Sequence, residues 1–129
     1  MEDMFKGTMM EALGIEVVEL QADYVVMKMP VSSKTKQPAG LLHGGASVAL
    51  AESAASLGTY RNIDTSKETA VGIEINANHI RSVSDGYVTA KAIPVHKGRT
   101  TMVWDVRITN DEDKLVCISR CTVGIRPLT

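Results

Sequence analysis

One stretch, Gly45 to Leu57, restricts how this chain can fold more than any other. Ala, Leu and Val fill most of it and no proline interrupts it, which predicts one helix with Gly58 placed to end it. Its residues are apolar or small on every side, a pattern typical of a helix buried all round. Glu52 is the one ionisable residue in it. Because a buried carboxylate is costly unless it is paired, solvated by a cleft or protonated, Glu52 indicates a functional site.

The remaining sequence predicts one further helix and six strands. Residues 3–13 carry apolar side chains at helical spacing, and Gly14 is expected to end that helix. The expected strands are residues 15–20, 24–29, 69–83, 86–95, 100–109 and 114–125. Asn110 to Asp113 are expected to form a hairpin turn. A curved antiparallel sheet of about six strands wrapped around one long buried helix satisfies this order, so we expect an α+β fold.

The third strand shows a simple alternation of side chains. One side of it is expected to carry Val71, Ile73, Ile75 and Ala77, and the other Gly72, Glu74, Asn76 and Asn78. This period of two is typical of a strand.

Length and composition point to one domain, residues 1–129, with an ordinary core. A formal net charge of -1 gives no reason to expect nucleic acid or an anionic membrane surface as a partner. No apolar run approaches the roughly 20 residues of a membrane helix, and the acidic start Met-Glu-Asp lacks the basic region of a secretory signal. The expected location is therefore the cytoplasm.

Two cysteines, Cys117 and Cys121, lie four residues apart in the last expected strand. Their Cα atoms would lie about 13 Å apart, beyond the reach of a disulfide. We therefore expect two buried, inert thiols. No second group of ligands has zinc spacing, so no metal site is expected.

The motif Gln37, His43-Gly44-Gly45-Ala46 and Glu52-Ser53, in this order and spacing, resembles that of the hotdog-fold thioesterases. The similarity extends to residues 41–48, residues 72–79 and Trp104, and is strongest to the 1,4-dihydroxy-2-naphthoyl-CoA hydrolases and the aryl-CoA thioesterases. The resemblance implies a hotdog fold and hydrolysis of an acyl-CoA thioester. Coenzyme A would be part of the substrate, and no separate cofactor is implied.

The expected chemistry begins at Gly44 and Gly45, at the start of the central helix. Backbone N–H groups there have no partner within the helix, and the helix dipole favours negative charge. A thioester carbonyl bound there would have its developing oxyanion stabilised. His43 and the Gln37 amide can hydrogen-bond the same oxygen or position water.

Glu52 lies about 12 Å further along the helix than Gly44, too far for both to hold one carbonyl. The resemblance resolves this distance, because family members form dimers in which the acidic residue of one subunit faces the glycine of the other. Glu52 would act as nucleophile or as base for water, and Ser56 shares its helix face. We expect a dimer joined edge to edge along residues 69–83 and assembled further into a tetramer.

Two further groups of residues are candidates for binding coenzyme A. Cations and N–H groups beside a glycine turn suit phosphate, and family members place the nucleotide along matching segments. The candidates are Gly72, His79, Arg81, Ser82, His96, Lys97, Gly98, Arg99, Thr100 and Thr101.

Simpler roles remain open for each of these residues. Glu52 could be paired with a strand cation, His43 could only cap the helix, Gly44 and Gly45 could only form a turn, and Gln37 and the basic loop could simply be solvated. Two other functions also remain: a hydratase or dehydratase of the same fold, and a non-catalytic acyl-CoA binding module. The aryl or fused-ring acyl group, with 1,4-dihydroxy-2-naphthoyl-CoA first, is the expected substrate class. Its pocket is expected to be lined by Val48, Ser53, Leu57 and the Met-rich N-terminus.

Overall fold

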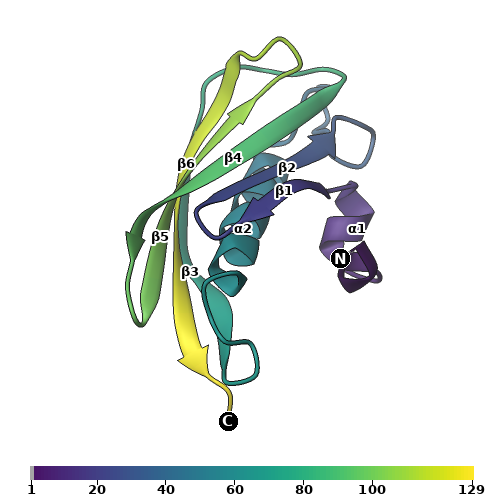
Figure 1. Cartoon of the computed structure of the whole chain (residues 1–129). Helices are drawn as coiled ribbons and strands as arrows, with labels where there is room; N and C mark the ends of the chain where they lie inside the picture. Colours follow the sequence, from purple (N-terminus) through teal and green to yellow (C-terminus); the bar gives the residue numbers. More distant parts are fainter. Residues whose placement is uncertain (1) are drawn as a thin grey trace.

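Six antiparallel strands form one curved sheet around the long helix α2 (Gly44–Tyr60), as seen in Figure 1. The computed structural model describes residues 2–129, so Met1 of the acidic start lies outside the described residues. A 3-10 turn, η1 (Glu2–Phe5), and a short helix, α1 (Met9–Leu13), precede the sheet. The strands are β1 (Glu16–Gln21), β2 (Tyr24–Pro30), β3 (Glu68–His79), β4 (Tyr87–Lys97), β5 (Thr101–Thr109) and β6 (Leu115–Pro127). The α+β class and the sheet wrapped around one helix are confirmed.

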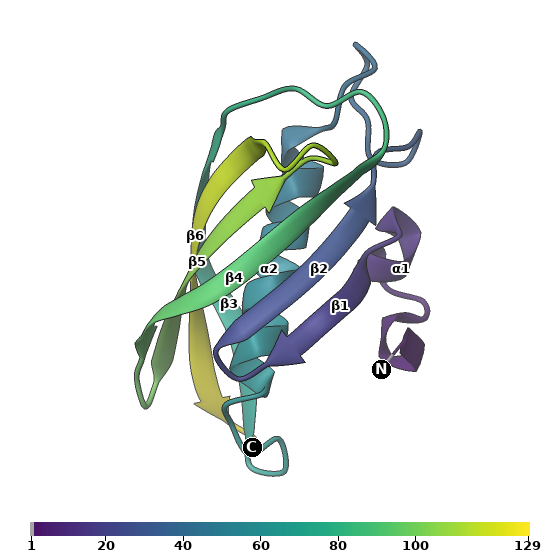
Figure 2. The ribbon, with the colours of Figure 1, turned by 45° about the horizontal axis from the view of Figure 1, so that its top comes forward.

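The order of the strands leaves β1 and β3 at the two edges of the sheet. Neighbouring strands follow the order β1-β2-β4-β5-β6-β3, and every pair is antiparallel. Figure 2 shows α2 lying along the concave side of the sheet and α1 outside the β1 edge. The longer of the two edges, that of β3, therefore carries a row of backbone groups without a strand partner among residues 2–129.

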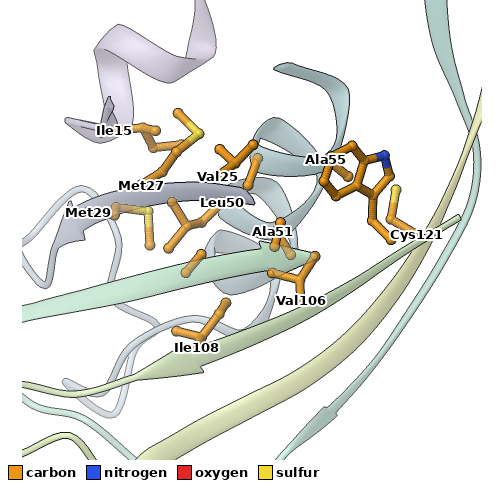
Figure 3. Packing of buried hydrophobic residues seen from close by; sticks show 14 of the residues in the cluster. Ile15, Val25, Met27, Met29, Leu50, Ala51, Ala55, Val106, Ile108 and Cys121 are labelled. Carbon is orange, nitrogen blue, oxygen red and sulfur yellow. The ribbon is translucent and has the colours of Figure 1, made fainter. Parts of the chain in front are cut away.

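The core lies between α2 and the concave face of the sheet. Leu50 and Ala51 of α2 are fully buried and face Val25 and Met27 of β2 and Val106 of β5 (Figure 3). Small alanines on α2 let the strands approach closely, so aliphatic side chains fill a core that contains few aromatic residues.

The C-terminal half of α2 differs from its expected form because of Trp104. Gly58 does not end the helix, which continues to Tyr60. A Cβ atom on Gly58 would lie 2.4 Å from Trp104 Cη2, so glycine is required here for ring packing. The indole Nε1–H donates to Thr59 Oγ1 at 3.0 Å, which satisfies the buried ring nitrogen.

Two other expectations about helices are wrong in detail. The N-terminal helix over residues 3–13 is broken, because Gly7 adopts a φ of 76° between η1 and α1. Gly14 does end α1, in a left-handed cap with a φ of 76°. The helix α2 is not buried all round: Ala49, Glu52 and Ser56 on the side away from the sheet are only partly buried.

A bulge in β3 changes the expected alternation of its side chains. The register shifts between Gly72 and Glu74, opposite Val123 and Thr122 of β6. Val71 and Ile73 are therefore exposed, at 48% and 50%. Beyond the bulge Ile75 and Ala77 pack against the core, so the four residues do not share one side as the simple alternation predicted.

The cysteines and the last hairpin agree with expectation. Cys117 and Cys121 are free and buried in β6. Burial, the largest cause, and the nearby charges of Glu52 and Glu74 raise the pKa of Cys121 to about 12. Asn110 begins the expected hairpin turn and its side chain accepts from the backbone N–H groups of Glu112 and Lys114.

Candidate active site

A cavity of about 320 Å³ at the start of α2 brings together residues from four segments of the chain. The segments are the loop before α2, the first turn of α2, the end of β3 with the residues that follow it, and the start of β6. The cavity is lined by Gln37, Leu41, Leu42, Gly44, Ser47, His79, Ile80, Arg81, Ser82 and Val116. Five residues expected in the site therefore meet in one place: Gln37, Gly44, His79, Arg81 and Ser82.

A tight turn fixes Gln37 at the mouth of this cavity. The backbone N–H of Gln37 donates to Leu41 O at 2.8 Å, and Gly40, with a φ of 85°, closes the turn. The Oε1 atom of Gln37 accepts from the backbone N–H of Ala39. Because Oε1 is held in this way, the Nε2 donors of the amide remain for a ligand.

His79 packs directly against the backbone of Gly44. A Cβ atom at position 44 would lie 2.8 Å from His79 Nε2, so the absence of a side chain makes this contact possible. Gly44 is the first residue of α2, and its N–H has no acceptor among residues 2–129. A donor with positive helix-end potential thus lies beside an imidazole, an Arg and a Ser.

His43 faces a different cavity. Its Nδ1 accepts from the backbone N–H of Gly45 at 2.8 Å, so His43 caps the helix and uses the second glycine N–H. An accepting Nδ1 places the proton of a neutral imidazole on Nε2. His43 lines a cavity with Lys34, Lys36 and Gly45 and not the one that holds Gln37 and Gly44. The structure thus supports the capping role that the sequence left open. Within one subunit, His43 and Gln37 line different cavities.

Glu52 lines a separate, larger cavity of about 440 Å³ on the open side of α2. Its other lining residues are mainly apolar and come from α2 and the N-terminal segment: Met4, Phe5, Met9, Met10, Ala49, Ser53, Ser56, Leu57 and Tyr60. Ser53, Leu57 and the Met-rich N-terminus were expected to line the acyl pocket and do line this cavity. Val48, which was expected there as well, does not.

The carboxylate of Glu52 lies against Gly72 of β3. A Cβ atom at position 72 would lie 2.1 Å from Glu52 Oε2, so only glycine leaves room for the carboxylate. The ion pairs among residues 2–129 join Lys28 to Glu16 and Arg107 to Asp105. The structural alternative for Glu52, pairing with a cation from a strand, is therefore absent from the described chain.

The second basic segment lies at the other end of the sheet from His79. Residues 96–101 form the β4–β5 hairpin, where Gly98 N–H donates to Thr101 O at 2.8 Å. In β3, His79 pairs with Cys117 of β6, whereas Gly72 pairs with Val123 of β6. Val123 also pairs with Met102 of β5, so it is the Gly72 end of β3 that lies near this hairpin. His96, Lys97, Arg99 and Thr100 are exposed there. One chain therefore does not bring the two expected phosphate-binding groups together.

The site is thus divided between two cavities that share no lining residue. One holds an uncommitted helix N–H, an amide, an imidazole and the Arg81 guanidinium, and the other holds a carboxylate beside an apolar space. In residues 2–129 no group of three or more His, Cys, Asp or Glu side chains is arranged to hold a metal ion. None of the described helices is long and apolar enough to span a membrane.

An antiparallel sheet around one helix, with a glycine N–H at the helix start and a carboxylate further along it, defines a hotdog-type thioesterase architecture. Residues 39–117 match the family model described as Thioesterase superfamily. The chain belongs to the thioesterase superfamily, and the expected enzyme class is confirmed.

Named relatives cover almost the whole chain. Putative esterase ComA2 of Bacillus subtilis is 55% identical over 120 residues, which are 93% of this chain and 95% of the relative. The 1,4-dihydroxy-2-naphthoyl-CoA hydrolase of Listeria monocytogenes is 47% identical over 116 residues, 90% of this chain and 94% of the relative.

Solved structures confirm the hotdog fold. A variant of thioesterase PA1618 from Pseudomonas aeruginosa, with one glutamine replaced by alanine, superposes with a TM-score of 0.96 at 46% identity, covering 98% of this chain and 91% of that one. Two variants of SAV0944 from Staphylococcus aureus superpose with a TM-score of 0.91 at 48% and 47% identity. They cover 93% and 92% of this chain, and 99% and 98% of theirs.

Two polar residues of these cavities, Tyr60 and Ser47, were not expected from the sequence. Tyr60 closes the Glu52 cavity, and its hydroxyl donates to Ala70 O at 3.1 Å. The expectation that the helix stops at Gly58 excluded Tyr60. Ser47 lines the Gly44 cavity. Its position three residues after Gly44, on the same helix face, was the available signal.

Proposed function

We propose that this protein hydrolyses an acyl-CoA thioester to the free acid and coenzyme A. The observation that carries the proposal is the pair of half-sites: an uncommitted Gly44 N–H beside Gln37, and an unpaired Glu52 carboxylate beside an apolar cavity. Gly44 N–H would polarise the thioester carbonyl, with Gln37 Nε2 as a neighbouring donor. Glu52 would attack the carbonyl carbon itself, forming an anhydride that water then hydrolyses to the free acid and the restored carboxylate, or take a proton from the water that attacks the thioester.

The proposal requires two subunits. Gly44 and Glu52 lie eight positions apart on one helix, roughly 12 Å, and line different cavities. The exposed edge of β3 runs from beside Gly72, which touches Glu52, to His79, which touches Gly44. Pairing of two β3 edges in antiparallel fashion would bring the Gly72 end of one subunit to the His79 end of the other. Assembly into a tetramer and a cytoplasmic location remain further proposals.

The same pairing would assign roles in binding coenzyme A. His79, Arg81 and Ser82 line the Gly44 cavity of one subunit, and the hairpin at residues 96–101 lies at the Gly72 end of the other. Cationic side chains and the backbone N–H groups near Gly98 suit the phosphates of the nucleotide. Ser56, one helical turn beyond Glu52, would contact the acyl part.

An aromatic acyl group is the proposed substrate class, with 1,4-dihydroxy-2-naphthoyl-CoA of menaquinone synthesis as the first candidate. The cavity beside Glu52 has Phe5, Leu57 and three methionines in its walls, which suits a flat apolar ring. The Listeria relative, named 1,4-dihydroxy-2-naphthoyl-CoA hydrolase, supports the same acyl group.

The variants chosen for solved relatives support the roles of Gln37 and Glu52. In SAV0944 the substituted residues are a glutamine and a glutamate that follows fifteen residues later. Gln37 and Glu52 have the same spacing. The two positions that were altered in that protein thus correspond to one residue of each half-site here.

A panel of acyl-CoA substrates tests the proposal, with release of free thiol as the readout. We expect hydrolysis of aryl-CoA substrates with a higher kcat/KM than for straight-chain substrates. A higher kcat/KM for long straight chains would refute the aromatic preference alone. Absence of hydrolysis across the panel, with binding of the same compounds retained, would instead identify an acyl-CoA binding module.

A further inference from the structure

The hydroxyl of Ser47 is buried without a hydrogen-bond partner. Ser47 is 1% exposed, and its Oγ is the one buried side-chain polar atom of residues 2–129 without a partner. The other buried polar residues are satisfied: Thr35 donates to Pro30 O, Thr59 to Ala55 O and Ser119 to Asn76 O. An unsatisfied buried hydroxyl costs free energy, and a bound ligand that accepts its hydrogen bond would remove this cost.

Ser47 lines the cavity that contains Gly44, Gln37 and His79. It lies three residues after Gly44 and so on the same helix face. Side chains of a helix tilt toward its N-terminus, so the Ser47 side chain leans back over the turn that contains Gly44. By contrast, Ser53 on the same helix already donates to Ala49 O at 2.6 Å. The helix α2 therefore gives the cavity two uncommitted donors, Gly44 N–H and Ser47 Oγ–H, in addition to the Gln37 amide of the loop.

We propose that Ser47 Oγ–H is the second donor to the thioester carbonyl oxygen, beside Gly44 N–H. This inference rests on the proposed function and adds a catalytic residue to it. A carbonyl oxygen has two lone pairs and can accept from both donors at once. Two donors fixed by the helix stabilise an oxyanion more than they stabilise the neutral carbonyl.

Ser47 keeps its proton throughout the reaction. Addition of the attacking oxygen breaks the π bond of the carbonyl and places its electron pair on the carbonyl oxygen, where the two donors hold it. The pair then returns to re-form the C=O bond, and the C–S bond breaks. The sulfur of coenzyme A leaves as a thiolate, which takes up a proton from solvent.

Two substitutions at Ser47 test the inference, measured with an aryl-CoA substrate that the wild type hydrolyses. Ser47→Ala should lower kcat by about 10²-fold with KM little changed, since one oxyanion donor is lost. The melting temperature should stay the same or rise, because an unsatisfied hydroxyl is removed. Ser47→Cys keeps a group of similar size but is a weak donor, so its kcat should also be low.

Ser119→Ala is the matched control, since Ser119 is equally buried but donates to Asn76 O at 2.8 Å. It should melt at a lower temperature and keep its kcat. A kcat of Ser47→Ala within about threefold of wild type would overturn the inference, as would full activity of Ser47→Cys. If Glu52→Ala is inactive while Ser47→Ala keeps its activity, the role of Ser47 is wrong and the proposed function still stands. A wild type without activity on any acyl-CoA would end the proposed function itself.

Discussion

Glu52 has its position because Gly72 has no side chain, and it has no cation to neutralise it among residues 2–129. Glu52→Ala should therefore lower kcat by about 10²–10⁴-fold, as expected for a positioned base or nucleophile. KM should change little, since the proposed contacts to coenzyme A lie elsewhere. The melting temperature should hold or rise, because no partner charge is left unpaired and Ala is the best helix former.

Glu19→Ala is a suitable control for that experiment, since Glu19 is exposed in β1, at the edge of the sheet opposite β3. It should change neither kcat nor the melting temperature appreciably. If Glu52→Ala instead melts much lower and turns over at a normal rate when folded, Glu52 is a structural residue and the catalytic role is wrong.

Cys121 provides a prediction about stability at high pH. Burial, together with the charges of Glu52 and Glu74, raises its pKa from the ordinary value of 9.0 to about 12. Between these values the unfolded chain loses a proton that the folded chain retains, so stability falls as the pH rises. Melting temperatures measured across this range should fall less steeply for Cys121→Ala than for wild type. Parallel curves for the two proteins would contradict this assignment.

At the scale of elements, the contact between α2 and β5 depends on Gly58. Gly58→Ala would place a Cβ atom 2.4 Å from the buried Trp104 ring, which also donates to Thr59 Oγ1. We expect a loss of about 1–3 kcal/mol in the free energy of unfolding, although Ala is normally the better helix residue. Denaturant unfolding measures this. Ser56→Ala, on the open side of the same helix, should keep or gain stability. An equal loss for Ser56→Ala would show that the loss at Gly58 does not come from contact with the Trp104 ring.

The elements themselves could largely be predicted from the sequence, because periodicity and turn residues are local signals. The six strands and the two-layer arrangement followed from them. What failed depended on contacts between distant residues. In the sequence Gly58 predicts a helix end, whereas in the structure it is the glycine that makes room for the Trp104 ring. The bulge that exposes Val71 and Ile73 depends on the register with β6.

The candidate site was predictable only in part, for the same reason. Gln37, Gly44 and His79 meet because a loop, a helix start and a strand end converge, and the motif resemblance supplied those residues. His43 belongs to the same motif, yet its Nδ1 is used by Gly45 N–H, a geometric detail that spacing does not contain. The position of Ser47 three residues after Gly44 was the one signal in the sequence, and it did not suffice, because burial without a partner is what distinguishes Ser47 from other serines.

At the scale of the whole molecule, the divided site makes a prediction about mixtures of subunits. If each site takes Glu52 from one subunit and Gln37 from the other, Gln37→Ala and Glu52→Ala should both be impaired as pure proteins. After subunit exchange, half of the dimers should be mixed, and each mixed dimer should contain one intact site and one doubly altered site. Activity should then recover to about a quarter of the wild-type value.

Exchange within a single preparation of either variant should restore nothing and serves as the control. Native mass spectrometry with one variant isotopically labelled would establish that mixed dimers form. If they form and activity stays at the level of the two pure variants, both residues act within one subunit. An active monomer in sedimentation at assay concentration would lead to the same conclusion. Either result would require Glu52 and Gln37 to meet on one chain, which their separate cavities do not allow without a rearrangement of α2.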